Sequence, residues 1–376
     1  INQVVLIDYI IIILGDEIMS KIPFNENEMN IAYTVPNLFD PTVPESPAWT
    51  YPQSEKDAIQ ELYAGTPTWC PSGLETGLFA PSVIPDNIAR GFVIEGIPYD
   101  MAKYGGPDMF GVEWEYVPVA GGSMVRPGAP LLEDVNDWRK ILKFPNIDEW
   151  DWDASGRENY KFLQNGKANM LWFLNGCWYE RLVSFMDFEG AVVALIDDEQ
   201  KDALKELFAE TTELYCRLVD RCVETYGDGI SGFTVHDDWG SQRAPFFSPA
   251  VGEEMIVPYM RQLTDHIKSK GMIADLHSCG SLEMQLPNFI KAGWQSWCPM
   301  PMNPTQKMYE EYGDKILLHV EPDLPEGASE EEQEKAGEEF VRNYFKPGKY
   351  CFPNTTYFPK KVTPAFRKGM YRASRQ

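Results

Sequence analysis

The second half of the chain alternates short apolar runs with longer amphipathic ones. In the short runs the apolar residues are adjacent, as in strands that are buried on both faces. In the longer runs apolar residues recur every three or four positions, as in helices with one buried face. Residues 168–176 (ANMLWFLNG) are the first such expected strand. Residues 197–229 are expected to form a helix with apolar positions at Leu204, Leu207, Phe208, Leu214, Leu218 and Val219.

The same alternation continues to the C-terminus. Ser248 and Pro249 are expected to be the N-cap and first residue of a helix that runs to Gly271, and Ser281 is expected to cap a short helix that ends at Gly293. Strands in strict succession with helices predict a parallel sheet with crossover connections. The further expected strands are residues 230–240, 272–280, 294–300, 315–323 and 349–354, and the further expected helices are residues 304–314 and 329–345.

Two α/β folds fit this order, a doubly wound sheet and a closed eight-stranded barrel. No G-x-G-x-x-G sequence follows the first strands, which weakens the dinucleotide-binding option. Polar and ligand-type residues stand at the end of nearly every expected strand, where the chemistry of barrel enzymes collects. We therefore expect an α/β protein with a (β/α)8 TIM barrel. The residues at the strand ends are Asn175, His236 to Asp238, His277, Cys279, Cys298 and Glu321.

The first half of the chain is irregular and rich in Pro and Gly. Residues 66–73 (TPTWCPSG) are expected to be the first strand, and residues 108–130 a hairpin. We expect an N-terminal extension, residues 1–59, followed by a single barrel domain, residues 60–376. Because the sequence from Met19 reads like an ordinary start, residues 1–18 are either foreign to the native protein or a genuine element packed on its body.

Composition narrows the class of protein. The 376 residues are 44% hydrophobic, which is enough for a large core. The net charge of −24 repels phosphate backbones and anionic lipid surfaces, so nucleic acid and membranes are unexpected partners. The apolar stretch near the start carries Asp8 and is too short to span a bilayer. Seven scattered cysteines favour a reducing cytoplasm over an oxidising compartment.

One sequence, ADLHSCGSLE, places an imidazole and a thiol two residues apart. On an extended strand His277 and Cys279 would point to the same side and could bind one transition metal. The alternative is a hydrogen-bonded core histidine beside a buried thiol. Cys298 and Glu321, at the ends of the next two strands, are the nearest further ligands by topology. Cys351 is the other possibility, although its place inside the last strand favours packing.

A second cluster, HDDWGSQ at residues 236–242, follows an earlier strand. Asp237 and Asp238 are candidates for proton transfer or for orienting a metal ligand, although a turn-capping Asp with Trp239 in the core explains one of the acids. Candidate substrate contacts are His236, Trp239, Gln242 and Tyr179. For Tyr179, packing in the core is the simpler role. The neighbouring Glu180 and Arg181 are expected to be a surface pair.

Together these sequences resemble the uroporphyrinogen decarboxylase superfamily, which also contains cobalamin-linked methyltransferases. The resemblance combines D-D-x-G-x-Q at 237–242 with H-x-C-G at 277–280, and extends over residues 108–115, 236–281, 309–323 and 357–370. It implies a barrel of eight β and α units with its site at the C-terminal ends of the strands. It covers most of the chain after about residue 60.

The resemblance favours the methyltransferase branch. The decarboxylases carry arginines after the first strand for a polyanionic tetrapyrrole, whereas residues 66–77 contain no basic residue. The methyltransferases hold zinc with an H-x-C pair, matched by His277 and Cys279, and with a late cysteine. That cysteine's place falls near Thr355 or Thr356, and Cys351 is out of phase with it. The third ligand is therefore open.

The resemblance thus implies a zinc-dependent methyltransferase that works with a separate corrinoid protein. We expect it to move a methyl group from a small O-methylated, aromatic donor to cob(I)alamin, with Asp237 or Asp238 orienting a ligand or giving a proton to the leaving oxygen. Three alternatives are a methylcobalamin:thiol methyltransferase, a decarboxylase without metal and a non-enzymatic tetrapyrrole-binding protein.

Overall fold

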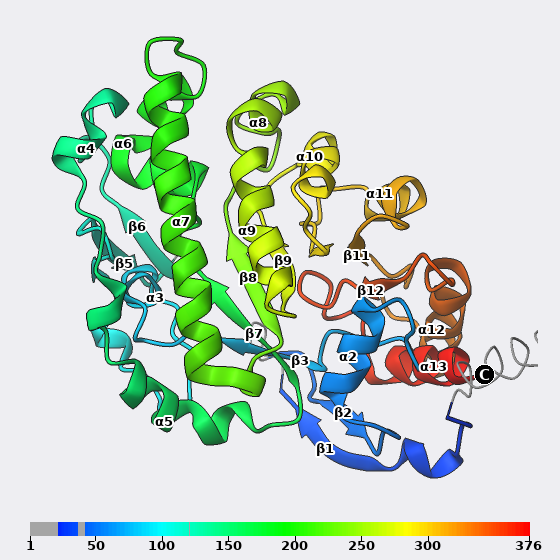
Figure 1. Ribbon diagram of the computed structural model, residues 1–376. Coiled ribbons are helices and arrows are strands. Elements are labelled where there is room, and N and C mark those ends of the chain that lie inside the picture. Colours follow the sequence, from blue (N-terminus) through cyan, green and yellow to red (C-terminus); the bar gives the residue numbers. More distant parts are fainter. Residues whose placement is uncertain (1–21, 37–41, 120) are drawn as a thin grey trace, which may run out of the picture.

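The computed structural model describes residues 22–36, 42–119 and 121–376, so the expectations for residues 1–18 lie outside the described residues. The centre of the molecule is a parallel sheet of seven strands in the order β12-β11-β10-β9-β8-β7-β3 (Figure 1). The strands are β3 (Thr76–Phe79), β7 (Ala168–Phe173), β8 (Gly232–His236), β9 (Ile273–His277), β10 (Ser296–Trp297), β11 (Leu317–Val320) and β12 (Cys351–Pro353).

Helices connect and flank these strands, which confirms the predicted succession from residue 168 onward. Ser248 accepts a hydrogen bond from the main-chain N–H of Val251 and caps α8, as predicted. The helices are α2 (Glu55–Tyr63), α3 (Pro85–Arg90), α4 (Trp138–Ile141), α5 (Trp152–Leu163), α6 (Tyr179–Ala194), α7 (Lys201–Tyr226), α8 (Pro249–Met255), α9 (Val257–Ser269), α10 (Leu286–Lys291), α11 (Thr305–Tyr312), α12 (Glu330–Tyr344) and α13 (Pro364–Arg375).

Three local expectations were wrong. Residues 66–73 are irregular, and the first strand of the sheet begins at Thr76, because Pro67 and Pro71 cannot donate to a strand ladder. Ser281 caps no helix, since a 3-10 turn at Glu283–Gln285 precedes α10. The helix expected over 249–271 breaks at Ile256, just before Pro258 in the first turn of α9.

The sheet curls into part of a barrel, and the full eight-stranded barrel is not confirmed. Its edges are β3 and β12, and no strand pairing joins these two among the described residues. The loops beside the edges do meet, because the hydroxyl of Thr355 donates a hydrogen bond to the carbonyl oxygen of Ser72. The fold is therefore a mixed α/β architecture that is compatible with a TIM-like barrel.

The two faces of the curled sheet have different surroundings. Side chains on the outer face pack in the main core with the crossover helices; among them Leu171, Phe233, Leu276 and Leu318 are fully buried. On the inner face Met170, Ile273 and Phe352 pack against Ile59 and Leu62 of α2, so that α2 covers the amino-terminal ends of the strands. The carboxyl ends, at the opposite side, carry the polar residues that the sequence singled out.

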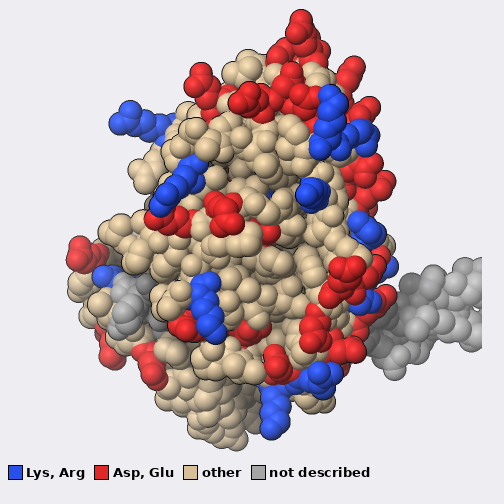
Figure 2. Space-filling view, turned by 90° about the vertical axis from the view of Figure 1, so that its left-hand side faces the viewer, with Lys and Arg blue, Asp and Glu red and all other residues tan. Residues whose placement is uncertain are grey.

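The described residues also form two small antiparallel sheets: β1 (Ile31–Val35) with β2 (Ser46–Trp49), and β4 (Gly106–Pro107) with β5 (Glu113–Val117) and β6 (Gly122–Val125). The second contains the hairpin predicted within residues 108–130, which is confirmed. On the face shown in Figure 2, acidic side chains gather along the upper rim, in keeping with the net charge. In the described part of the chain, every helix is too short or too polar to cross a lipid bilayer.

Candidate functional site

Asp237, the first residue after β8, is fully buried and holds the start of α6. Its carboxylate accepts hydrogen bonds from the main-chain N–H of Glu180 at 2.9 Å and from the indole N–H of Trp239 at 2.7 Å. Burial raises the pKa of Asp237 to about 7, because the charged form loses its hydration. The α6 N-cap, Trp178, provides no side-chain hydrogen bond, so Asp237 satisfies N–H groups that the helix leaves open.

Glu180, in the first turn of α6, connects a cation to a histidine. One carboxylate oxygen lies 2.6 Å from Nη1 of Arg90, and the other contacts Nδ1 of His236. Burial alone would raise the pKa of Glu180, but the charges of Arg90 and His236 lower it well below its ordinary value. The pKa of His236 is raised, since Glu180 and Asp238 outweigh the effect of its burial. Glu180 therefore fixes the His236 ring and its protonated Nδ1.

The opposite nitrogen of His236 belongs to a cluster of three possible metal ligands. Ligand atoms of His236, Asp238 and His277 all lie within 4.8 Å of one another. Nε2 of His236 is 3.8 Å from Oδ1 of Asp238, and the two imidazole rings stack with centroids 4.7 Å apart. Burial, together with the neighbouring His236, lowers the pKa of His277 to about 4. His277 is therefore neutral at neutral pH, the form that binds metals.

Cys279 lies against this cluster. Its Sγ is 3.3 Å from Nε2 of His277, and its main-chain N–H donates to Oδ1 of Asp238 at 2.7 Å. Burial and the Asp238 charge raise the pKa of the thiol above its usual range, so the proton stays on sulfur unless a cation replaces it. The structure thus brings the predicted pair together and adds His236 and Asp238 from the neighbouring strand.

The two other predicted ligands lie in different surroundings. Cys298 is the first residue after β10, whose last residue, Trp297, pairs with Leu276 of β9 and Leu318 of β11. Its thiol hydrogen-bonds Asn354 at 3.6 Å and also Thr356, a position where the resemblance places the late cysteine. The Glu321 carboxylate forms a 2.6 Å ion pair with Lys361. Among the described residues neither belongs to the close ligand cluster, and their roles as ligands stay predictions.

The predicted substrate contacts also differ in accessibility. Trp239 is fully buried between Phe247 and Phe289. Tyr179 is buried against Phe247, and its hydroxyl has no hydrogen-bond partner among the described residues. Gln242 is exposed on the loop after β8. Of this set, only His236 belongs to the ligand cluster.

Sequence reasoning missed Arg90 and assigned Glu180 and Arg181 to a surface pair, which is wrong. Arg181 is 1% exposed and lies between the carboxylates of Asp86 and Asp108. The carboxylate of Glu180 does not pair with Arg181 but contacts Arg90 and His236. No local pattern marks either pairing, because 90 residues separate Arg90 from Glu180 and 95 separate Asp86 from Arg181.

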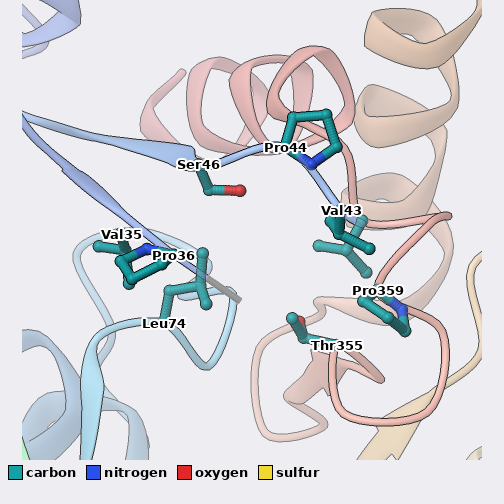
Figure 3. A pocket seen from close by; sticks show the side chains of 9 residues that line it. Val35, Pro36, Val43, Pro44, Ser46, Leu74, Thr355 and Pro359 are labelled. Carbon is teal, nitrogen blue, oxygen red and sulfur yellow. The ribbon is translucent and has the colours of Figure 1, made fainter. Parts of the chain in front are cut away.

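The small recess in Figure 3 is unsuited to a substrate. It lies between the segment after β1 and the loop after β12, and Val35, Leu74, Thr355 and Val362 are among the residues that line it. Its free volume of about 10 Å³ holds roughly one water molecule. The cluster at the ends of β8 and β9 is the better candidate site because it gathers three possible metal ligands. Its two imidazoles and one carboxylate, together with the Cys279 thiol beside them, are the donors that zinc accepts.

Comparison with known proteins shows a shared fold. No protein-family model matches the chain, and no curated protein matches it. Among solved structures, a methyltransferase from Methanosarcina mazei superposes with a TM-score of 0.55 at 13% identity, over 86% of this chain and 98% of that one. Dispersin B (9% identity, 80% and 99% covered) and a GH138 enzyme targeting pectin rhamnogalacturonan II (11%, 70% and 38%) both have a TM-score of 0.28.

Proposed function

We propose that this protein is a zinc-dependent methyltransferase, which takes a methyl group from an O-methylated aromatic donor and passes it to the cob(I)alamin of a separate corrinoid protein. The observation that carries the proposal is the contact of Glu180 with Nδ1 of His236. Metal-binding histidines usually donate their second N–H to a carboxylate, which fixes the ring and raises its basicity. The fold shared with a methyltransferase supports the class of reaction.

The residues of the cluster and the adjoining Cys279 fit a zinc ion. His236 and His277 would offer nitrogen, Cys279 sulfur and Asp238 oxygen, and all four come from the ends of two adjacent strands. Zinc bound there would supply Lewis acidity to the oxygen that loses its methyl group. Cys298, the first residue after β10, is a further proposed ligand, and Glu321 would need to leave Lys361 first.

The two aspartates have separate roles in this proposal. Asp237 positions α6, and through it Glu180, because its oxygens accept main-chain and indole N–H groups. Asp238 has a side chain that is 28% exposed, so it can meet a substrate as well as Cys279. When the methyl group leaves, the donor's oxygen gains a proton from solvent, and the Asp238 carboxylate can orient the water that delivers it.

The test joins metal content to methyl transfer. The purified protein should hold about one zinc ion and should methylate a reduced corrinoid protein with at least one methoxylated aromatic, seen as a change in the cobalt absorption spectrum. His277→Ala and Cys279→Ser should lose both the zinc and the transfer. His266→Ala and Cys216→Ser, changes of the same residue types away from the cluster, should retain them. Zinc-loaded protein that methylates cobalt from no donor would refute the proposal.

A further inference from the structure

Three of the four histidines of this chain lie on the inner face of the curled sheet: His236, His277 and His319. On β11, Leu318 and Val320 are fully buried in the outer core, whereas Leu317 packs with the inner cluster of Met170 and Ile273. Since side chains alternate along a strand, His319 points inward with Leu317.

The fourth histidine, His266, lies outside the sheet on α9, where its Nε2 is 2.8 Å from Oδ1 of Asp220.

His319 has no hydrogen-bond partner among the described residues. Its Nδ1 is buried and unpaired, while the ring as a whole is half-buried. The ring lies on Phe352, with centroids 4.8 Å apart and planes at 28°, which holds its orientation. A buried polar atom without a partner loses the hydrogen bond that it would make to water in the unfolded chain. Packing alone would favour an apolar residue here, so the imidazole points to a ligand group that completes its hydrogen bonding.

The distance from the ligand cluster limits that ligand. His277 is on β9 and His319 on β11, with β10 between them. Adjacent strands are about 4.8 Å apart, so the backbones of β9 and β11 are separated by roughly 10 Å across the sheet. An aromatic ring with oxygen atoms at positions 1 and 4 spans this distance when the contact that each oxygen makes with the protein is added.

We infer that His319 is a second substrate contact, which hydrogen-bonds a neutral oxygen at the end of the aromatic donor opposite its methoxy group. This inference rests on the proposed function and adds the substrate class, para-hydroxylated methoxyaromatics. Burial lowers the pKa of His319 to about 4, and a neutral imidazole donates one hydrogen bond and accepts another, which suits a hydroxyl. The buried acid Asp275 on the same inner face, held by Thr234 and Ser296, disfavours a carboxylate there.

The experiment compares two donors that differ only at the remote position, 4-methoxyphenol and methoxybenzene. The ratio of their kcat/KM values should favour 4-methoxyphenol by about tenfold or more, mainly through KM, in the wild type. His319→Phe keeps the ring on Phe352 but removes the hydrogen bond, and should bring the ratio close to one. His319→Asn, which can still donate and accept, should restore part of it, and His266→Phe should leave the ratio unchanged. A ratio that survives His319→Phe would overturn the inference.

A binding measurement separates this inference from the proposed function. Benzene-1,4-diol has both oxygens and no methyl group, and its dissociation constant can be obtained from tryptophan fluorescence without turnover. If no donor is demethylated, yet this diol binds about tenfold more weakly to His319→Phe than to the wild type or His266→Phe, the proposed reaction fails while the contact stands. Equal affinities, or no binding to the wild type, would overturn the contact itself.

Discussion

The carboxylate of Glu180 contacts Nδ1 of His236 and thereby directs the other ring nitrogen toward Asp238 and His277. The same carboxylate is held at its second oxygen by Arg90, 2.6 Å away. The orientation of the His236 ring at the end of β8 is therefore determined by Glu180, at the start of α6, and by the distant Arg90. This relationship makes the cluster a candidate metal centre and is the first to test.

Glu180→Gln should weaken zinc binding by about 10- to 100-fold, because a neutral amide no longer orients His236 or raises its basicity. Competition with a chelator of known affinity measures the change. Glu224→Gln, which alters an exposed carboxylate paired with Arg221, is the matched control and should bind zinc like the wild type. Unchanged affinity in Glu180→Gln would show that His236 is not a ligand.

Gly176→Ala should destabilise the fold and distort the end of β8. The residue has a φ of 55°, and an added Cβ would overlap the main-chain oxygen of His236 and come 2.6 Å from Oδ1 of Asp237. We expect the free energy of unfolding in urea to fall by roughly 2–4 kcal/mol.

Gly227→Ala provides the comparison for this variant. Gly227 has nearly the same φ, 53°, but its Cβ would meet nothing within 4 Å. Its ψ of −128° lies outside the left-handed helical region, so only backbone strain remains, and the loss should be about 1–3 kcal/mol and smaller than that in Gly176→Ala. Equal losses of unfolding free energy in the two variants would mean that the contact of the added Cβ with His236 is not destabilising.

Arg181→Leu should cost about 3–5 kcal/mol of stability, because it leaves Asp86 and Asp108 buried without their shared cation. Thermal or urea unfolding measures the loss. Arg126→Leu, which breaks an exposed ion pair with Glu115, should change stability little. If the two variants behaved alike, the buried network would not be an important support of α6.

Stability should fall as the pH rises through about 6, in part through Asp86. Burial raises the pKa of Asp86 from 3.8 to about 6, although Arg181 opposes this. Below about pH 4 both the folded and the unfolded chain hold the proton, and between about pH 4 and 6 only the folded chain does. The contribution of this proton to stability is therefore complete in acid and is lost as the pH passes 6.

Urea unfolding of Asp86→Asn across this range checks the sign. The variant should lose part of the decline in unfolding free energy between about pH 4 and pH 7, since the side chain no longer titrates. Asp265→Asn changes a surface carboxylate whose pKa is lowered, and it should leave this decline intact. If the unfolding free energy of Asp86→Asn declined as steeply as that of the wild type, the decline would be due to the titration of other groups.

The residue pattern alone was sufficient to predict the succession of strands and helices from residue 168 to the C-terminus and the pairing of His277 with Cys279. Both are local: periodicity reports which faces are buried, and His277 and Cys279 are only two residues apart at the end of one strand. Prediction failed where proline controls the backbone, at residues 66–73 and at Ile256, and where a cap depends on a neighbouring segment, at Ser281.

The completion of the ligand cluster, in contrast, depends on the fold. In the sequence Asp237 and Asp238 are equivalent acids, but the fold turns Asp237 toward the N-terminus of α6 and Asp238 toward His236 and Cys279. It also places Glu180 and Arg90 beside His236 across 56 and 146 residues of chain. Such contacts arise from the curl of the sheet and the packing of α6 on it, and side-chain patterns along the chain carry no record of them.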